Sequence, residues 1–477
     1  MVRDCGEVKM NRTMDRIILP AGIRYVIGTA DILANMSEQR PMVPFSGEIL
    51  EFLDLWSKNI RARMREEGES FPDAASFAFW CRQASLEKMR DDYGPELVVR
   101  LGTGTVLCYA ASNVPVLFAF CAAAALLAGN CVILRLPTKE TPQERLILGA
   151  LEQTFAVLQK WRERIVLLRY EKSREINEFL AALCSVRMIW GGDFTVREIR
   201  QIPLPVRARE ITFPDRSSAA LIDAEAVLAA ENLSETVRSF YNDTYLNDQN
   251  ACSSPRIVYW LGKEDEAAAA RERFWQAVSD YAGPRYDLSA VLAVKKLEQA
   301  YCIAALREDA KITFYGKQEG QNPGAVSEEQ AVRRPGVLFE KKPEADLNKQ
   351  AAADFGQQPE INFRKPSGRP EENKKGNTVV SVWLDRLDAS CHALSVPGGF
   401  FLESGGTTLE GFYPILTEKC QTVTVFGTDL MKLRDEFRSR RLSGPDRVVP
   451  FGHALDFSLI WDGRDLIREM SRVISAG

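Results

Sequence analysis

Short apolar runs alternate with segments of helical character in the middle of the chain. The apolar runs span residues 105–110, 131–134, 165–169 and 186–190, and the helical segments between them span residues 116–128, 143–161 and 176–184. Alternation of strand and helix is typical of βαβ units, which build a parallel sheet. We therefore predict an α/β fold with a doubly wound sheet, in which ligands bind at the carboxyl ends of the strands.

One stretch, residues 105–134, carries no charged side chain and is long enough for a membrane span. However, Asn113, Pro115, Gly129 and Asn130 divide it into pieces of strand and helix length. No cluster of Lys or Arg flanks it as a topology signal. The pattern thus favours a buried strand–helix–strand unit and no membrane span.

Two regions differ from this pattern. Residues 1–95 are polar and mixed, with helical character over residues 57–93, and we predict that they form an N-terminal cap or arm. Residues 317–377 are rich in Glu, Lys, Gln, Pro and Gly, which is typical of a surface insertion. Apolar runs resume at residues 378–384 and 421–426. A closing helix is predicted at residues 466–474.

The composition is that of a soluble globular protein, with 45% apolar and 26% charged residues. A net charge of -4 provides no dominant basic field, which argues against nucleic acid as the main partner. The 10 cysteines are scattered without a C-x-x-C pair, so no metal site or redox pair is predicted. Scattered cysteines suit a reducing compartment, and the N-terminus lacks the apolar core of a signal peptide. We expect a cytoplasmic location.

Cys252 is the candidate nucleophile. It lies among small polar residues in the run NDQNACSSPR, directly before an apolar strand at residues 257–260. A cysteine at such a turn is exposed enough to react, and we expect nearby backbone N–H groups to lower its pKa. A half-buried structural cysteine is the alternative for any single cysteine, and the neighbouring motifs decide between the two.

The run NDQNACSSPR resembles the nucleophile segment of the fatty acyl-CoA reductases of the bioluminescence (LuxC) type, a branch of the aldehyde dehydrogenase superfamily. Further runs resemble the same family in the same order: CYAASNVP with AGNCVILRLPTKETP, MIWGGDFTVREI, EITFPDRSSAALIDA, and CQTVTVFG with DRVVPFGHALDFSLIWDGRDLI. The resemblance covers roughly residues 100–477, interrupted by the polar insertion. Several ordered motifs are a strong signal, where any one alone is weak.

The resemblance implies an aldehyde-dehydrogenase-like α/β fold with the active site in a cleft between two lobes. The doubly wound cofactor-binding lobe corresponds to residues 96–245, the α/β catalytic lobe to residues 246–430, and residues 431–477 return to the cofactor lobe. The implied reaction is reduction of a fatty acyl thioester to an aldehyde through an acyl-enzyme on Cys252. Asn113 corresponds to the side-chain donor of the oxyanion hole, with the Cys252 backbone N–H as the second donor. Taken alone, Asn113 before Pro115 is more typical of a turn.

The resemblance also implies a nicotinamide cofactor. Arg135 stands where the superfamily usually has a lysine at the adenosine ribose, and Thr138 or Lys139 replaces an acidic residue there. Loss of that carboxylate favours a 2′-phosphate, so NADPH is the expected cofactor. Gly191, Gly192 and Asp193 begin a helix where a pyrophosphate would accept N–H groups, with an ordinary strand-to-helix turn as the alternative.

Aldehyde-oxidising members carry a glutamate general base at a position that falls on Thr212. Glu210 lies two residues earlier and, on a strand, on the same face. Without a base to activate water, an acyl-enzyme survives until hydride arrives, which agrees with a reductase.

The expected partners, all implied by the resemblance, are a fatty acyl thioester substrate, an acyl-protein synthetase or acyl carrier protein that delivers it, and a second copy of the chain. Three alternatives remain open. Cys252 with His392 or His453 would make an acyltransferase or thioesterase. A superfamily member without catalysis would bind acyl chains or partner subunits. An acylating aldehyde dehydrogenase would use the same residues in the direction of acyl-CoA.

Overall fold

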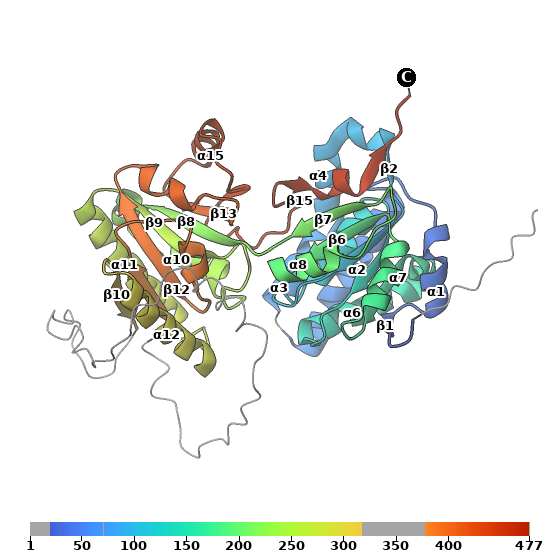
Figure 1. Ribbon diagram of the computed structural model, residues 1–477, viewed down its shortest axis with the longest axis horizontal. Coiled ribbons are helices and arrows are strands. Elements are labelled where there is room, and N and C mark those ends of the chain that lie inside the picture. The colour runs from blue at the N-terminus through green and yellow to red at the C-terminus, as the bar shows by residue number, and fades with distance from the viewer. Residues whose placement is uncertain (1–19, 70, 317–376, 477) are drawn as a thin grey trace, which may run out of the picture.

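The computed structural model describes residues 20–69, 71–316 and 377–476. It consists of two lobes, each built on its own largely parallel sheet, which lie side by side in Figure 1. The predicted α/β class is confirmed.

The first lobe contains a sheet of strand order β1-β5-β4-β3-β6-β7. Its strands are β1 (Arg24–Ile27), β3 (Thr105–Tyr109), β4 (Cys131–Arg135), β5 (Ile165–Arg169), β6 (Val186–Trp190) and β7 (Arg209–Phe213). All neighbours run parallel except β1, which runs antiparallel to β5. The chain moves outward from β3 through β4 to β5 and then returns to β6 on the other side. This switch point places a crevice at the carboxyl ends of β3 and β6.

Helices α5 (Leu117–Leu127), α6 (Pro142–Val157), α7 (Arg174–Ala182) and α8 (Asp193–Arg200) connect these strands. Every residue of α5 is buried, as expected for a helix that is apolar on all sides. It lies between β3 and β4, so the uncharged stretch forms the predicted strand–helix–strand unit. In the part of the chain that the structure describes, no helix combines the length and apolarity needed to cross a membrane.

The N-terminal residues are part of the first lobe rather than a separate cap or arm. Helices α1 (Ala30–Asn35), α2 (Gly47–Glu67), α3 (Pro72–Trp80) and α4 (Gln83–Tyr93) precede the first parallel strand. The apolar face of α2 is buried in the core of this lobe, where Phe52 stacks on Trp161 with ring centroids 4.5 Å apart. Apolar side chains at helical spacing therefore join residues 20–95 to the sheet, and the prediction of an arm was wrong for them.

The second lobe contains a sheet of strand order β10-β11-β12-β9-β8-β13-β14. The strands are β8 (Ser217–Asp223), β9 (Pro255–Leu261), β10 (Lys311–Tyr315), β11 (Val379–Trp383), β12 (Phe400–Gly406), β13 (Cys420–Phe426) and β14 (Arg447–Pro450). The helices are α9 (Ala224–Ala229), α10 (Ser234–Thr244), α11 (Glu264–Ala282), α12 (Ala290–Leu306), α14 (Cys391–Leu394) and α15 (Leu430–Ser439).

The boundary between the lobes lies earlier than the expected residue 245. Strand β8 pairs with β9 and β13, so the chain enters the second lobe at residues 214–216. The prediction was wrong because β8 joins the second sheet by pairing with strands that lie farther along the chain, and a local sequence pattern does not predict such pairing. Residues 317–376 of the predicted insertion lie outside the described residues.

The C-terminal segment returns to the first lobe after Pro450, later than the expected residue 431, because α15 and β14 still belong to the second lobe. It forms β15 (Ile460–Trp461), β16 (Arg464–Asp465), α16 (Leu466–Glu469) and β17 (Ser471–Val473). The predicted closing helix is thus only one turn long. It ends where β17 exchanges backbone hydrogen bonds with β2 (Arg100–Gly102) of the first lobe.

Short 3₁₀ helices occur at η1 (Met36–Glu38), η2 (Gly94–Val99), η3 (Gln159–Arg164), η6 (Leu409–Gly411) and η7 (Tyr413–Ile415).

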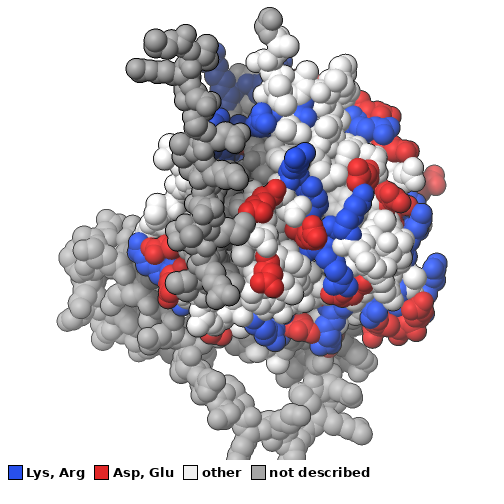
Figure 2. All heavy atoms as spheres, turned by 90° about the vertical axis from the view of Figure 1, so that its right-hand side faces the viewer, with Lys and Arg blue, Asp and Glu red and all other residues white. Residues whose placement is uncertain are grey.

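Figure 2 shows the outer face of the first lobe, where basic and acidic side chains are interspersed without a large field of one sign. Such a mixed face is typical of a solvated protein surface.

Candidate active site

A cavity of about 920 Å³ lies between the two lobes. The first lobe contributes the loops that follow β3, β4, β6 and β7, and the second lobe contributes the loop before β9. The predicted residues that line it are Cys252, Asn113, Arg135, Thr138, Lys139, Gly191 and Gly192. The structure therefore brings the candidate nucleophile and most candidate cofactor residues to one site, at the carboxyl edge of the first sheet.

The loop that carries Cys252 is held rigidly on the second sheet. Asp248 and Gln249 both adopt positive φ, at 51° and 58°, which is unfavourable for residues other than glycine. The side chain of Gln249 is fully buried and compensates for this strain. Its Nε2 donates to the Pro255 carbonyl at 2.8 Å, and its Oε1 accepts the Gly399 N–H at 2.9 Å. One buried amide thus fixes the loop that presents the thiol to the cavity.

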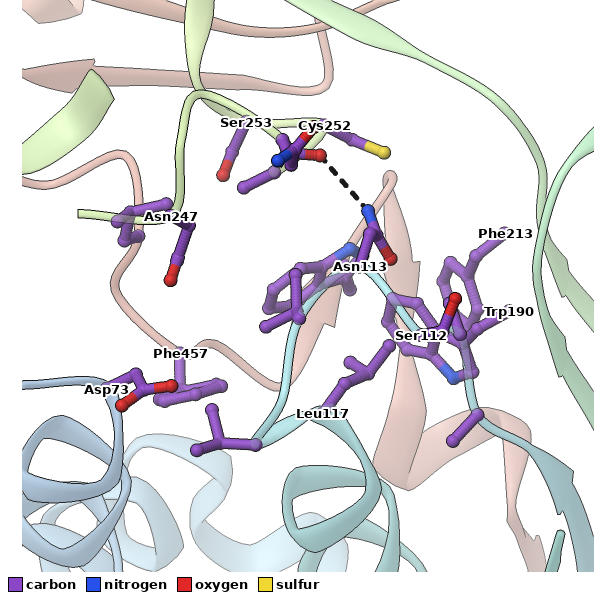
Figure 3. A pocket seen from close by; sticks show the side chains of 18 of the residues that line it. Asp73, Ser112, Asn113, Leu117, Trp190, Phe213, Asn247, Cys252, Ser253 and Phe457 are labelled. Carbon is purple, nitrogen blue, oxygen red and sulfur yellow. Dashed lines mark hydrogen bonds between the residues drawn. The ribbon is translucent and has the colours of Figure 1, made fainter. Parts of the chain in front are cut away.

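Cys252 is half-buried, and the backbone around it is fixed by neighbours. Its carbonyl accepts a hydrogen bond from the Ser218 hydroxyl at 2.7 Å. Among the described residues its own N–H has no hydrogen-bond partner, so this donor remains available to a ligand. In Figure 3 the sulfur points into the space above Asn113.

The expectation that backbone N–H groups lower the pKa of the Cys252 thiol was wrong in its net direction. Burial raises the pKa above the ordinary value of 9.0, and the carboxylates of Asp462 and Asp215 raise it further. The backbone N–H of Arg216 and the guanidinium of Arg256 act in the opposite direction but are outweighed. Desolvation disfavours the thiolate more than the nearby donors favour it.

Asn113 lies in the loop after β3 and reaches across to the other lobe. Its Nδ2 donates to the backbone carbonyl of Asn250 at 3.1 Å, as Figure 3 shows. A side-chain amide carries two N–H groups, so this contact uses one and leaves the second for a ligand beside Cys252. The hydrogen bond to Asn250 thus holds the side-chain amide of Asn113 in place.

Arg135, Thr138 and Lys139 lie at the end of the cavity formed after β4. The Arg135 guanidinium stands 4.9 Å from the Tyr170 ring, and its Nη2 donates to the Tyr170 carbonyl at 3.3 Å. Its Nε is buried without a hydrogen-bond partner among the described residues. An orphaned guanidinium N–H, an exposed lysine and a hydroxyl fit the phosphorylated ribose of a dinucleotide.

Gly191 and Gly192 precede α8 as predicted, but the helix N-terminus already holds a carboxylate. Asp215 accepts the Asp193 N–H at 3.1 Å, and Asp193 accepts the Asp215 N–H at 3.3 Å. Lys419 binds the Asp193 carboxylate at 2.9 Å. A pyrophosphate here would share the helix N-terminus with Asp215, so these residues fit a dinucleotide less well than the ribose end does.

Glu210 and Thr212 lie on β7 and do not line the cavity. Glu210 binds Arg187 at 2.5 Å and Arg200 at 2.7 Å, and Arg200 also contacts the Thr212 hydroxyl at 3.4 Å. Neither residue stands where it could activate a water molecule at Cys252. These side chains form an ion-pair network beside the sheet, and the general-base position at Thr212 or Glu210 stays a prediction.

The cavity also contains carboxylates that the sequence did not single out: Asp73, Asp215, Asp243, Asp456 and Asp462. Asp215 follows a predicted strand of the parallel sheet, so its place after the strand was a usable signal. Asp462 reaches the site from the C-terminal segment, and nothing local to the sequence indicates this. Among the described residues no group of three or more His, Cys, Asp or Glu side chains is arranged to hold a metal ion.

The two histidines do not line the cavity. Both ring nitrogens of His392 are engaged, with the Ser217 hydroxyl at 2.5 Å and the Ile415 carbonyl at 2.7 Å. His453 pairs with Asp456 at 2.6 Å on an exposed loop. This arrangement does not favour a Cys–His pair at Cys252.

The family model described as acyl-CoA reductase (LuxC) matches residues 83–281. No curated protein matches the chain. Among solved structures, PnpE from Pseudomonas sp. WBC-3 is 14% identical, with 92% of this chain and 87% of that chain covered and a TM-score of 0.55. Aldehyde dehydrogenase 21 from Physcomitrella patens is 13% identical, with 93% and 89% covered and a TM-score of 0.58.

A third similar structure is the NADP-dependent glyceraldehyde-3-phosphate dehydrogenase from Bacillus halodurans, solved with NADP. It is 12% identical, with 93% of this chain and 87% of that chain covered and a TM-score of 0.53. At such identities the likeness establishes the fold. Residues 83–281 are thus similar to the acyl-CoA reductase (LuxC) family, and the chain has the fold of the aldehyde dehydrogenases.

Proposed function

We propose that this protein reduces an acyl thioester to the aldehyde with NADPH, through an acyl-enzyme on Cys252. The observation that carries the proposal is the single cavity that contains Cys252, Asn113 and the cluster Arg135, Thr138 and Lys139. The family match over the residues that carry the nucleophile supports it.

The Cys252 thiolate attacks the thioester carbonyl and forms a tetrahedral oxyanion. The second N–H of Asn113 and the Cys252 backbone N–H stabilise this oxyanion, because both donors are held at the thiol by the rigid loop. The leaving thiolate of the donor then departs, and the acyl group remains on Cys252. A thioester in the acyl-enzyme replaces the thioester of the donor, so the exchange is nearly balanced in bond energy.

A bound nicotinamide cofactor supplies the hydride for the reduction. The resulting thiohemiacetal oxyanion uses the same two donors, and its collapse releases the aldehyde and regenerates the Cys252 thiolate. Glu210 is bound to Arg187 and Arg200 and does not line the cavity, which disfavours a role in directing water at the acyl-enzyme. This agrees with reduction rather than hydrolysis of the acyl group.

Arg135 and Lys139 would hold the 2′-phosphate of the cofactor, and Thr138 would hydrogen-bond it. The expected result is a preference for NADPH over NADH in kcat/KM. Lys139→Glu should reverse much of this preference, because it places a carboxylate beside the phosphate. Equal use of both cofactors by the wild-type protein would contradict the assignment. NADP and NAD are each bound by similar structures, so the fold accommodates either cofactor.

The test combines NADPH absorbance with intact mass spectrometry, using purified protein, a long-chain acyl-CoA and a Cys252→Ala control. Oxidation of NADPH with formation of aldehyde, lost in the control, is the expected result. An acyl adduct on Cys252 with NADPH unchanged would instead indicate a transferase or carrier. If the protein forms acyl-CoA from aldehyde, CoA and NADP⁺ faster than it reduces acyl-CoA, it is an acylating aldehyde dehydrogenase. Parallel assays with an acyl carrier protein thioester identify the preferred donor.

We further propose that a second copy of the chain covers the apolar side chains exposed on α12 and on the neighbouring strand β10. Val291, Val294 and Tyr301 are 65%, 62% and 63% exposed, and Phe314 on β10 is 41% exposed. Exposed apolar groups beside the last strand of a sheet are typical of an interface. Light scattering should give the mass of an oligomer, and Tyr301→Glu should reduce it to that of a monomer. A monomeric wild-type protein would refute the proposal.

A further inference from the structure

The cavity extends in two directions from the catalytic thiol. In Figure 3, Trp190 and Phe213 lie on one side of Asn113, toward the strand ends of the first sheet, while Asp73 and Phe457 lie on the other. Trp190 and Phe213 stack with ring centroids 3.8 Å apart, and they adjoin the candidate cofactor residues Gly191 and Gly192. The branch toward Asp73 is therefore the one that remains for the acyl group.

This second branch, here called the acyl branch, contains Phe457 beside Asp73 in Figure 3, and the apolar residues Pro72, Val116, Leu117 and Leu455 also line the cavity. Val116 and Leu117 are buried, and Phe457 stacks on Phe120 of the first-lobe core. Such a surface suits an alkyl or aryl chain, because burial of apolar area is favourable at roughly 25 cal/mol per Å². A charged group in the wall of this branch therefore needs an explanation.

Asp456, between Leu455 and Phe457, also lines the cavity but pairs with His453 at 2.6 Å, so Asp73 is the carboxylate that needs an explanation. It lies in the first turn of α3, and its Oδ1 accepts the Ala74 N–H at 2.9 Å. Its Oδ2 is buried and has no hydrogen-bond partner among the described residues. None of the ion pairs of the described residues includes it. Burial raises the pKa of the Asp73 carboxyl, consistent with a group that lacks a cationic neighbour.

An acceptor left unpaired in an apolar wall costs about 1–3 kcal/mol, and a ligand that brings an O–H or N–H recovers this free energy. A plain alkyl chain would desolvate the Asp73 carboxylate without donating a hydrogen bond to it. A site built around such a polar group discriminates strongly against analogues that lack the matching group. Asp73 thus creates a specificity that apolar walls alone do not produce.

We propose that Asp73 is a specificity-determining residue and that the acyl group placed on Cys252 carries a hydrogen-bond donor, a hydroxyl or an ammonium group, which binds the Asp73 carboxylate in the acyl branch. This inference rests on the proposed function, since it names the acyl group that the same site accepts. Under this proposal, the acyl group carries a hydrogen-bond donor and is not the plain fatty acyl chain that the sequence resemblance implies.

The test uses acyl-CoAs in matched sets of several chain lengths, whose members differ only in a terminal hydrogen, hydroxyl or amino group. We expect the donor-bearing members to exceed the plain member by about 10-fold or more in kcat/KM at the best length, the equivalent of about 1.4 kcal/mol. A larger preference for the hydroxyl than for the amino member, or the reverse, identifies the donor. Equal or better use of the plain member at every length overturns the proposal.

Two substitutions separate the role of Asp73 from a structural one. Asp73→Asn keeps a carbonyl acceptor, so the hydroxyl preference should persist while the preference for the amino member falls. Asp73→Leu should improve the plain member and abolish both preferences. Asp91→Asn, which changes an exposed carboxylate on α4 whose partner among the described residues is the adjacent Arg90, is the matched control and should leave all ratios unchanged. Equal losses for all members in Asp73→Leu would overturn the proposal, with thermal denaturation verifying that each variant is folded.

Acylation of Cys252, followed by mass spectrometry without NADPH, distinguishes this inference from the proposed function. Selective acylation by donor-bearing members with no oxidation of NADPH would refute the reductase and support the role of Asp73. Oxidation of NADPH with no selectivity would support the reductase and refute the role of Asp73.

Discussion

The side-chain amide of Asn113 donates a hydrogen bond to the backbone carbonyl of Asn250 across the cleft, at 3.1 Å. Asn113 follows β3 of the first lobe, and Asn250 lies two residues before Cys252 in the second. The contact therefore links the loop of the candidate nucleophile to the first lobe. It also orients the amide, since one N–H is used and the other is directed by the planar geometry of the group.

Replacement of Asn113 by Ala should slow acylation of Cys252 by about 100-fold, because removal of one oxyanion donor typically costs 10²–10³ in rate. Asn113→Asp should be slower still, since it adds a negative charge where an oxyanion forms. Single-turnover acylation measured by mass spectrometry tests both variants. A rate for Asn113→Ala within about twofold of the wild-type value would exclude Asn113 from the oxyanion hole.

Asp462→Asn should increase the reactivity of Cys252 near neutral pH. The Asp462 carboxylate raises the pKa of the Cys252 thiol, so its removal lowers that pKa and enlarges the thiolate fraction at any pH below it. The Asn side chain can still accept the hydrogen bond that Gln421 donates to Asp462 at 2.6 Å. The pH profile of iodoacetamide modification should shift to lower pH, with a rate a few-fold higher at neutral pH.

Peptide mapping is required in this experiment because Cys302 is exposed and also reacts with iodoacetamide. Asp446→Asn is the matched control: Asp446 also pairs with Arg216, but it is not one of the main causes of the pKa shift at Cys252. An unchanged profile in Asp462→Asn, or the same shift in both variants, would show that the Asp462 charge does not act on the thiol.

Glu210→Gln should destabilise the fold without affecting the thiol. The guanidinium of Arg187 is only 3% exposed and binds Glu210 at 2.5 Å, so the variant leaves a buried cation without its counter-charge. Such a loss costs about 3 kcal/mol, which urea unfolding would detect as a lower midpoint. Hydrolysis of an acyl group placed on Cys252 should stay at the wild-type rate. Slower hydrolysis in Glu210→Gln would instead identify Glu210 as a general base.

Asp243 should make stability depend on pH between about 4 and 7. It is fully buried, and this burial raises its pKa to about 7 although it accepts N–H groups from Gly452 and Ala454. In the unfolded chain the carboxyl loses its proton near 3.8. Between these values the folded state binds more protons, so the free energy of unfolding falls as pH rises, by at most about 1.4 kcal/mol per unit.

Asp243→Asn does not titrate and should remove this part of the pH dependence. Urea unfolding of both proteins at about pH 5 and pH 8 tests it: the wild-type protein should lose stability relative to the variant as pH rises. Parallel curves for the two proteins would mean that Asp243 has an ordinary pKa in the folded state.

The strands and helices of the first lobe follow from the sequence because their signals are local. Residues 165–169 and 186–190 form β5 and β6 with the predicted bounds, and α5 is buried on all sides as its apolar composition requires. The approach of Asn113 to the Cys252 loop was also predictable, since motifs that resemble a known family identify residues of the same site. Local pattern and family resemblance together placed the nucleophile segment before its strand.

The tertiary structure alone decided the environment of the candidate nucleophile Cys252. Asp215 comes from the end of β7 and Asp462 from the returning C-terminal segment, and only packing brings their charges to Cys252. Packing also placed β8 in the second sheet and bound Glu210 to two arginines. Burial and through-space charge depend on segments far apart in the chain. The sequence therefore identifies Cys252 as the candidate residue, whereas it does not predict the direction in which the pKa of its thiol is shifted.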